Sequence, residues 1–243
     1  MDPRARALWI RHLPGYATRL ARGLRSAEWR RAIGGLHYTS YDASLPAGSL
    51  GQYFWQDLWC ANLIADLRPN SVIDVGSRID GFVGWISTLV PVTYVDTRRP
   101  GTEIPGIHYR EGSVLSLPFA NESVDCLSSL HVIEHIGLGR YGDKLDFNGT
   151  RKAATELARV IAPGGYLLVS MPIGGISRIV FDAHRVHTRA DVLKMFEGLV
   201  LTKEVLIPEG GGILEAPSEA DFDRASYGVG IFLFTRTVPD AAA

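Results

Sequence analysis

The sequence predicts a doubly wound α/β fold, in which a mostly parallel sheet carries helices on both faces. Three observations support this prediction. Short apolar runs typical of buried strands alternate along the chain with helical patterns. The run at residues 71–75 ends in a glycine turn that leads into a predicted helix, as in a nucleotide-binding corner. The last two predicted elements are both strands, which places one antiparallel strand at the edge of the sheet.

The composition is that of a folded globular protein. The chain has 243 residues, with 46% apolar and 21% charged residues, which suits one domain with a substantial core and an appendage. A net charge of −1 gives the whole chain no electrostatic bias toward nucleic acid. The sequence contains no recognisable signal peptide and no apolar run near about 18 residues, so we expect a cytoplasmic protein. Cys60 and Cys126 lie in apolar runs and are expected to be buried thiols.

The first 50 residues differ in charge from the rest. Residues 1–35 carry eight arginines against Asp2 and Glu28, a net charge of +6. Apolar residues interleave with these arginines at roughly helical spacing. The segment is therefore either a basic amphipathic helix that rests on anionic lipid, or a helical arm that covers part of the domain. We expect an arm and loop over residues 1–50 and one domain over residues 51–243.

The domain is predicted to begin with a helix, a strand and the glycine turn. Apolar side chains recur at helical spacing over residues 52–67. β-Branched residues favour a strand at residues 71–75, which Gly76 ends. A short helix should follow through residues 85–89. The next strand, at residues 92–96, ends in an acidic residue.

The remainder of the domain alternates in the same way. Apolar runs predict further strands at residues 106–110, 123–130, 166–171, 200–207 and 228–237, which makes seven in all. Helical patterns predict helices at residues 150–161 and 190–196, the first ended by Pro163-Gly-Gly165. The connection at residues 97–105 is short for a parallel crossover, so we expect an irregular loop there.

Several short motifs carry a resemblance to a known family. They are, in chain order, Val72-Ile-Asp-Val-Gly76, Val95-Asp96, Gly112 with Leu117-Pro-Phe119, Ser123-Val-Asp125, His131-Val-Ile-Glu-His135 and Arg159-Val-Ile-Ala-Pro-Gly-Gly165. Over residues 70–237 the chain resembles a class I S-adenosylmethionine-dependent methyltransferase, whose Rossmann-like sheet has seven strands with the last one antiparallel. The segments at residues 130–143 and 181–185 are similar to an uncharacterised methyltransferase-like subfamily linked to bacterial surface-polysaccharide clusters.

The resemblance implies an S-adenosylmethionine site at the carboxyl ends of the strands. Asp74 and Gly76 would shape the pocket for the methionine end of the cofactor. Asp96, which lies 22 positions after Asp74, would hold the ribose. Ser113 and Val114 would flank the adenine. The remaining members of the implied set are Ser77, Arg78, Asp80, Thr97, Leu130 and His131, of which the last two would form the wall near the sulfonium.

The chain departs from the family pattern in the glycine turn. Family members have Gly-x-Gly-x-Gly, whereas this chain has Gly76-Ser-Arg-Ile-Asp-Gly81. Arg78 and Asp80 bring side chains to places where they would crowd a cofactor, although Arg78 could instead pair with its carboxylate. Ser113 replaces the acid that commonly binds the adenine amino group. The resemblance favours methyl transfer to an oxygen of a small molecule such as a glycan precursor; the alternative is a non-catalytic or cofactor-free binding or assembly protein.

The candidate acceptor site follows the strand at residues 123–130. His135 is the expected general base, because histidine titrates near neutral pH; the alternative is a histidine that caps the following loop. The other candidates are Glu134, Arg140, Tyr141, Asp182, His184 and Arg185. The arginines would pair with an anionic acceptor, such as a sugar acid or phosphate, or else bridge to nearby aspartates.

The segment at residues 131–135 also matches the His-x-x-Glu-His pattern of zinc proteases. That chemistry requires both histidines one turn apart on a long helix. Here the predicted strand ends at Leu130, and Gly137 and Gly139 would end any helix within about two turns. The sequence therefore predicts no metal site.

Overall fold

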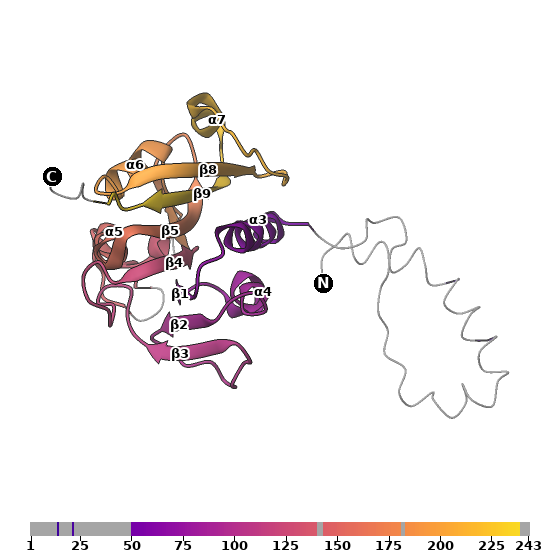
Figure 1. Ribbon diagram of the computed structural model, residues 1–243. Coiled ribbons are helices and arrows are strands. Elements are labelled where there is room, and N and C mark those ends of the chain that lie inside the picture. Colours follow the sequence, from indigo (N-terminus) through magenta and orange to yellow (C-terminus); the bar gives the residue numbers. More distant parts are fainter. Residues whose placement is uncertain (1–13, 15–20, 22–49, 140–142, 181–182, 239–243) are drawn as a thin grey trace. The chain divides into compact units, whose positions relative to one another are not determined.

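The computed structural model describes residues 50–139, 143–180 and 183–238, together with positions 14 and 21. The arm predicted at residues 1–50, and with it the predicted lipid contact, lies almost wholly outside the described residues. Within the domain, seven strands form one sheet in the order β3-β2-β1-β4-β5-β9-β8. Figure 1 shows α3 and α4 on one side of this sheet and α5 and α6 on the other. The domain is therefore doubly wound, as predicted.

Parallel pairing at the centre of the sheet becomes antiparallel at one edge. In spatial order the strands are β3 (Ile107–Glu111), β2 (Val92–Asp96), β1 (Val72–Val75), β4 (Val124–Leu130), β5 (Ile161–Ile173), β9 (Gly228–Thr235) and β8 (Val200–Pro208). All pairs from β3 to β5 are parallel, whereas β9 runs antiparallel to both β5 and β8. The predicted sheet, with its antiparallel last strand, is confirmed.

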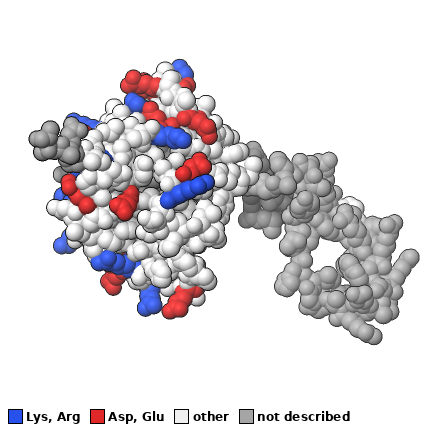
Figure 2. Space-filling model, viewed as in Figure 1, with Lys and Arg blue, Asp and Glu red and all other residues white. Residues whose placement is uncertain are grey.

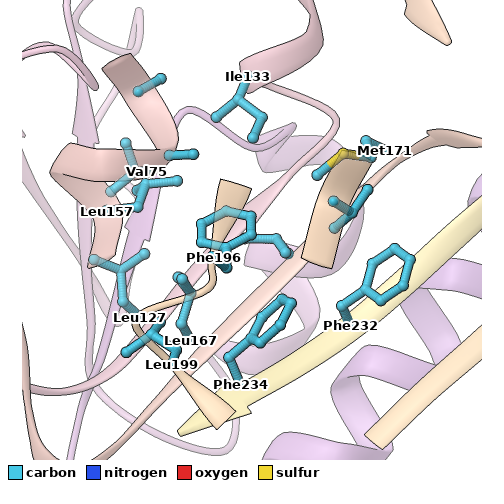
Figure 3. Packing of buried hydrophobic residues seen from close by; sticks show 14 of the residues in the cluster. Val75, Leu127, Ile133, Leu157, Leu167, Met171, Phe196, Leu199, Phe232 and Phe234 are labelled. Carbon is cyan, nitrogen blue, oxygen red and sulfur yellow. The ribbon is translucent and has the colours of Figure 1, made fainter. Parts of the chain in front are cut away.

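The core consists of one apolar cluster on each face of the sheet. The helices on one face are α3 (Gln52–Leu67) and the short α4 (Gly84–Ile86), which follows a π-helical turn, η2 (Ile79–Val83). The other cluster includes buried residues of α5 (Gly149–Val160), α6 (Arg189–Met195) and α7 (Glu219–Arg224). Figure 3 shows Leu157 and Phe196 of this second cluster above Leu127 and Phe234 of the sheet. Both faces of the central strands β1 and β4 are thereby largely removed from water.

The structure differs from the sequence prediction in four places. The helix expected at residues 85–89 is only three residues long, because the chain first makes the π-helical turn. Pro163-Gly-Gly165 does not end α5, which stops at Val160; it lies in β5, where the register with β4 shifts and Gly164 has a φ of +77°. The hairpin of β6 (Arg178–Val180) and β7 (His184–Val186), and α7, are too short to give a periodic pattern.

The surface carries no single-sign patch on the face drawn in Figure 2, where Lys and Arg side chains lie among those of Asp and Glu. Over the described ranges, no helix combines the length and the apolar character needed to cross a membrane. The predicted thiols, Cys60 and Cys126, are both buried and reduced.

The two-sided core predicts a large difference between two leucines. Leu127 is fully buried in β4, whereas Leu145 is 78% exposed. Leu127→Ala should lower the free energy of unfolding by about 2 to 5 kcal/mol, because it removes buried methyl groups and leaves a cavity. Leu145→Ala should change it by less than about 0.5 kcal/mol. Urea unfolding followed by circular dichroism measures both, and equal effects would contradict the packing described.

Candidate functional site

The glycine turn lies at the carboxyl ends of β1 and β4, where the strand order reverses. Ligands in open α/β sheets bind in the crevice at this position. Gly76 has a φ of +72°, and a Cβ there would lie only 3.0 Å from Cγ1 of Val132. The Gly76 N–H donates a hydrogen bond to the carbonyl of Val95, which ties the turn to β2. Conformation and close approach therefore both require glycine at this position.

Asp74 is the buried polar centre of the turn. Its carboxylate accepts hydrogen bonds from Ser128 Oγ at 2.6 Å, from Ser77 Oγ at 2.7 Å and from the Ser77 N–H at 3.1 Å. Ser77 Oγ in turn accepts a hydrogen bond from the Leu130 N–H at 2.9 Å. Burial raises the pKa of Asp74 to about 6, although the hydrogen bonds from Ser128 and Ser77 oppose the shift. Asp74 thus fixes the conformation of the turn, because its hydrogen bonds join the ends of β1 and β4.

A small hollow lies above this turn. Its lining residues are Tyr53, Gln56, Asp57, Ser77, Arg78, Phe82 and Leu130. The hollow has a volume of about 10 Å³, which is enough for about one water molecule. A larger ligand therefore requires movement of the side chains that line it, and those from α3 form one side of the hollow.

Arg78 and Asp80 do not fill the turn. Arg78 Nη2 lies 2.8 Å from Asp80 Oδ2, and the two side chains are 61% and 71% exposed. The Arg78 guanidinium also lies over the ring of Tyr53, 5.1 Å from its centroid. The side chains that could crowd a cofactor thus pair with each other in solvent, and Arg78 and Tyr53 form the outer wall of the hollow.

Three lining residues from α3 do not belong to the set predicted from sequence. Gln56 is only 2% exposed, and its Oε1 accepts a hydrogen bond from Ser170 Oγ at 2.6 Å. A Cβ at Gly81 would collide with Oδ2 of Asp57, so the π-helical turn fits closely against this carboxylate. Burial raises the pKa of Asp57, against the opposing hydrogen bonds from Gln56 and from the backbone of Phe82. The sequence does carry a signal for Gln56. This polar residue lies one helical turn before Cys60, and therefore on the face of the helix that packs on the sheet.

Asp96 stands at the end of β2, at the position predicted for a ribose ligand. The residue is 8% exposed. Its carboxylate accepts hydrogen bonds from the Tyr94 hydroxyl at 3.0 Å and from the Arg98 N–H at 2.8 Å. The Arg98 side chain also reaches the carboxylate, at 3.3 Å, but is 71% exposed. Ligand hydroxyls could therefore take the place of the Arg98 guanidinium at the Asp96 carboxylate, because the displaced guanidinium would remain hydrated.

The predicted ribose and adenine residues are close together. Thr97 Oγ1 lies 3.5 Å from Asp96 Oδ1. The Gly112 N–H donates to the carbonyl of Asp96 at 3.3 Å, which brings the following Ser113 and Val114 next to the end of β2. Val114 is buried, and Ser113 Oγ accepts a hydrogen bond from a backbone N–H two residues on.

A buried carboxylate lies between two histidines after β4. Glu134, in the 3-10 turn η3 (Ile133–His135), is fully buried. Its Oε1 lies 2.9 Å from His131 Nδ1 and 3.7 Å from His135 Nε2. Burial by itself would raise the pKa of Glu134, but the hydrogen bond from His131 and the charges of both histidines hold it below its usual range. Glu134 is therefore ionised at neutral pH.

The β6–β7 hairpin brings a third histidine to this cluster. His135 Nδ1 lies 2.7 Å from the carbonyl of Ala183, so this nitrogen carries the proton. The ring centroids of His135 and His184 are 6.0 Å apart, and His184 Nε2 lies 3.3 Å from the hydroxyl of Tyr227. The predicted acceptor residues Glu134, His135 and His184 are thus neighbours. Arg140, Tyr141 and Asp182 lie outside the described residues.

Arg185 supports the cluster by donating hydrogen bonds to the loop after β4. It is 7% exposed, and burial lowers its pKa. Its Nη1 donates hydrogen bonds to the carbonyl of Ile136 at 2.7 Å and to Thr150 Oγ1 at 3.0 Å, and its Nη2 to the carbonyl of Asp146 at 3.4 Å. These partners give Arg185 a role in fixing the loop after β4. Its predicted contact with an anionic acceptor stays a prediction.

The zinc-protease pattern has no counterpart in the structure. β4 ends at Leu130 and is followed by a 3-10 turn of three residues, so the two histidines do not share a long helix. In the described ranges, no group of three or more His, Cys, Asp or Glu side chains is arranged to hold a metal ion.

Comparison with known sequences gives two matches. The family model described as "Caenorhabditis protein of unknown function, DUF268" matches residues 115–204, which is less than half of the chain. A curated protein of Mycolicibacterium smegmatis, named "Probable S-adenosylmethionine-dependent methyltransferase", is 30% identical over 169 residues, or 60% of this chain. The matched region covers 56% of that protein, so the chain spans little more than half the length of this relative.

Comparison with solved structures identifies the fold. The 4+2-cyclase SpnF superimposes with a TM-score of 0.53 at 12% identity, over 74% of this chain and 81% of the cyclase. A geranyl diphosphate C-methyltransferase from Streptomyces coelicolor A3(2), solved with Mg²⁺, geranyl diphosphate and S-adenosyl-L-homocysteine, gives a TM-score of 0.52 at 12% identity, over 74% and 78% of the two chains. Such low identities show the fold alone. They confirm the predicted Rossmann-like fold of class I methyltransferases.

The buried carboxylate of Asp74 predicts a pH-dependent contribution to stability. Because its pKa in the folded protein is about 6, against about 3.9 for an unperturbed Asp, the folded state binds the proton more tightly than the unfolded state. The stabilisation is fully present below about pH 4 and is lost as the pH rises through 6, amounting to about 3 kcal/mol. Asp74→Asn should remove this pH dependence, whereas the exposed control Asp125→Asn should retain it. Urea unfolding at pH 4 and pH 7 measures the difference; identical profiles for wild type and Asp74→Asn would contradict the assignment.

The contacts of Arg185 predict which segment depends on it. Arg185→Leu should leave the carbonyls of residues 134–146 without their buried donor, at a cost of about 1 to 3 kcal/mol. Local opening should then speed amide hydrogen exchange over residues 134–139 by about 10-fold or more. Arg151→Leu, at an exposed position of α5, is the matched control. Mass spectrometry measures the exchange, and an unchanged rate in Arg185→Leu would contradict the structural role of Arg185.

Proposed function

We propose that this chain, whose fold and curated relative support a place in the class I S-adenosylmethionine-dependent methyltransferase superfamily, transfers a methyl group from S-adenosylmethionine to an oxygen of a small molecule. One observation carries the proposal. The Asp96 carboxylate stands at the end of β2, next to the glycine turn at the point where the strand order reverses. A carboxylate in this position is placed to accept hydrogen bonds from both ribose hydroxyls.

The cofactor would lie across the ends of β1, β2 and β4. Its methionine end would enter the hollow above Ser77, and its adenine would lie against Ser113 and Val114. Because the hollow now admits about one water molecule, binding requires Tyr53 to move outward. Arg78 lies beside the hollow with a largely exposed side chain, so it could exchange Asp80 for the carboxylate of the cofactor.

S-adenosylmethionine is the cofactor named for the curated relative of this chain. The chemistry that it supplies when bound is an activated methyl group on a sulfonium. The protein then has to position the acceptor and remove a proton from it. The segment after β4 offers both functions, because Glu134, His135 and His184 are close to one another at the carboxyl end of that strand.

The acceptor is proposed from the sequence resemblance. A sugar or glycan precursor, and a place among bacterial cytoplasmic enzymes of surface-polysaccharide synthesis, rest on the resemblance of residues 130–143 and 181–185. His135 as general base is compatible with its geometry, because its Nδ1 bonds to the Ala183 carbonyl and leaves Nε2 to accept a proton.

A second candidate function is binding or assembly without methyl transfer. The narrowness of the hollow favours it. The 4+2-cyclase neighbour shows that this fold also occurs in a protein named for other chemistry. Cofactor binding distinguishes the two functions.

Calorimetric titration tests the proposal. Purified protein should bind S-adenosylmethionine and S-adenosylhomocysteine. Asp96→Ala should weaken both by about 100-fold or more, because it removes two hydrogen bonds to a charged group, each worth about 1.5 to 3 kcal/mol. Asp125→Ala, at an exposed position near the opposite end of the parallel strands, is the matched control and should bind like wild type.

The same titration can refute the proposal. An absence of heat with both ligands would favour the non-catalytic function. Equal weakening in Asp96→Ala and Asp125→Ala would show that the ribose site lies elsewhere.

A further inference from the structure

Three buried polar atoms near the ends of β4 and β5 have no hydrogen-bond partner among the described residues. They are His131 Nε2, Glu134 Oε2 and His187 Nε2. Buried polar groups are almost always hydrogen-bonded, because an unpaired one costs free energy. Two of these atoms belong to one hydrogen-bonded pair, His131 and Glu134. Their remaining capacity is therefore a sign of a ligand group that the pair is built to receive.

The pair has the geometry of an oriented base. Nδ1 of His131 lies 2.9 Å from Oε1 of Glu134. An ionised carboxylate accepts hydrogen bonds only, so the proton of a neutral His131 is on Nδ1. The other nitrogen, Nε2, then presents a lone pair. A buried carboxylate that fixes the tautomer in this way also stabilises the imidazolium that forms when Nε2 takes up a proton.

His131 lies next to the hollow, although it is not among the residues that line it. His131 directly follows Leu130, whose N–H is tied to Ser77, and Leu130 lines the hollow. His131 has a φ of +55°, an unusual conformation for a non-glycine residue that is often found at functional sites. Its ring makes an edge contact with the ring of Tyr53, which also lines the hollow, at a centroid distance of 5.0 Å. The outward movement of Tyr53 that admits a cofactor would uncover His131 as well.

We propose that His131, positioned by Glu134, accepts the proton of the reacting hydroxyl group. This inference rests on the proposed function. The acceptor oxygen attacks the methyl carbon, and the electrons of the carbon–sulfur bond pass to sulfur, which leaves as a neutral thioether. The hydroxyl proton moves to Nε2 of His131, and the resulting imidazolium later returns it to water.

His131 suits this role better than His135. The carboxylate oxygen of Glu134 is within hydrogen-bond distance of His131 but lies 3.7 Å from His135. The Nδ1 of His135 is instead paired with the neutral carbonyl of Ala183, which stabilises an imidazolium less than a carboxylate does. His135 is then a residue that supports the pair and the following loop.

The same atoms define the chemical class of the acceptor. Both Nε2 of His131 and Oε2 of Glu134 accept hydrogen bonds, so they match O–H groups. An anionic oxygen of a phosphate or a carboxylate would be repelled by the ionised Glu134. The group that reacts is therefore a neutral hydroxyl, as in a polyol or a sugar ring.

Nitrogen NMR of ¹⁵N-histidine-labelled full-length protein tests the pair directly. At pH 8 His131 should carry its proton on Nδ1, with Nε2 unprotonated, whereas a free imidazole prefers the opposite tautomer. Glu134→Leu should return His131 to the Nε2–H form. A proton on Nε2 in the wild type would overturn the proposal, and this result does not depend on whether the variant folds.

A second measurement places His131 near the reacting centre. The Nε2 ¹⁵N chemical shift of His131 should differ between the complexes with S-adenosylmethionine and with neutral S-adenosylhomocysteine, because only the first places a sulfonium cation near this nitrogen. The exposed His108 on β3 is the internal control and should behave alike in both complexes.

The outcomes separate this proposal from the proposed function. Identical behaviour of His131 in the two complexes, with both ligands bound, would overturn the base while leaving the cofactor site intact. If calorimetry shows that neither ligand binds, the proposed function fails and this inference fails with it, whatever the tautomer.

Discussion

The buried carboxylate of Asp74 is the interaction on which the site depends. It lies beneath the glycine turn and accepts hydrogen bonds from Ser77 and from Ser128, which is 54 positions away in sequence. Ser77 Oγ in turn accepts a hydrogen bond from the backbone of β4, at Leu130. These bonds hold the ends of β1 and β4 together at the point where the strand order reverses. The turn, the hollow and the segment after β4 are all positioned from this junction.

Two polar features lie on either side of the junction. Asp96 on the β2 side is the proposed ribose ligand. The His131–Glu134 pair on the β4 side has acceptor atoms without a partner among the described residues. Between them the hollow is nearly closed by side chains from α3, with Tyr53 in contact with both Arg78 and His131. Cofactor binding and exposure of the proposed base would thus depend on the same movement, which would keep water away from the base until a ligand is present.

The sequence predicted the sheet because β-branched runs and amphipathic stripes are local signals. It also placed Gly76 and Asp96 correctly at strand ends, since strand boundaries fix those positions. It could not predict the contribution of α3, because Tyr53, Gln56 and Asp57 reach the turn only after the helix packs on the sheet. The contact of Arg185 with the loop after β4 was missed for a similar reason: a hairpin with three-residue strands gives no periodic signal. The sequence likewise showed Glu134 and both histidines without indicating which histidine the carboxylate holds.

The most direct test of the account is a crystal structure of the chain soaked with S-adenosylhomocysteine. The account predicts ribose hydroxyls within hydrogen-bond distance of the Asp96 carboxylate, Tyr53 displaced from the hollow, and His131 Nε2 facing the sulfur. Density for the ligand elsewhere, or a ligand-free hollow still covered by Tyr53 at saturating concentration, would contradict it.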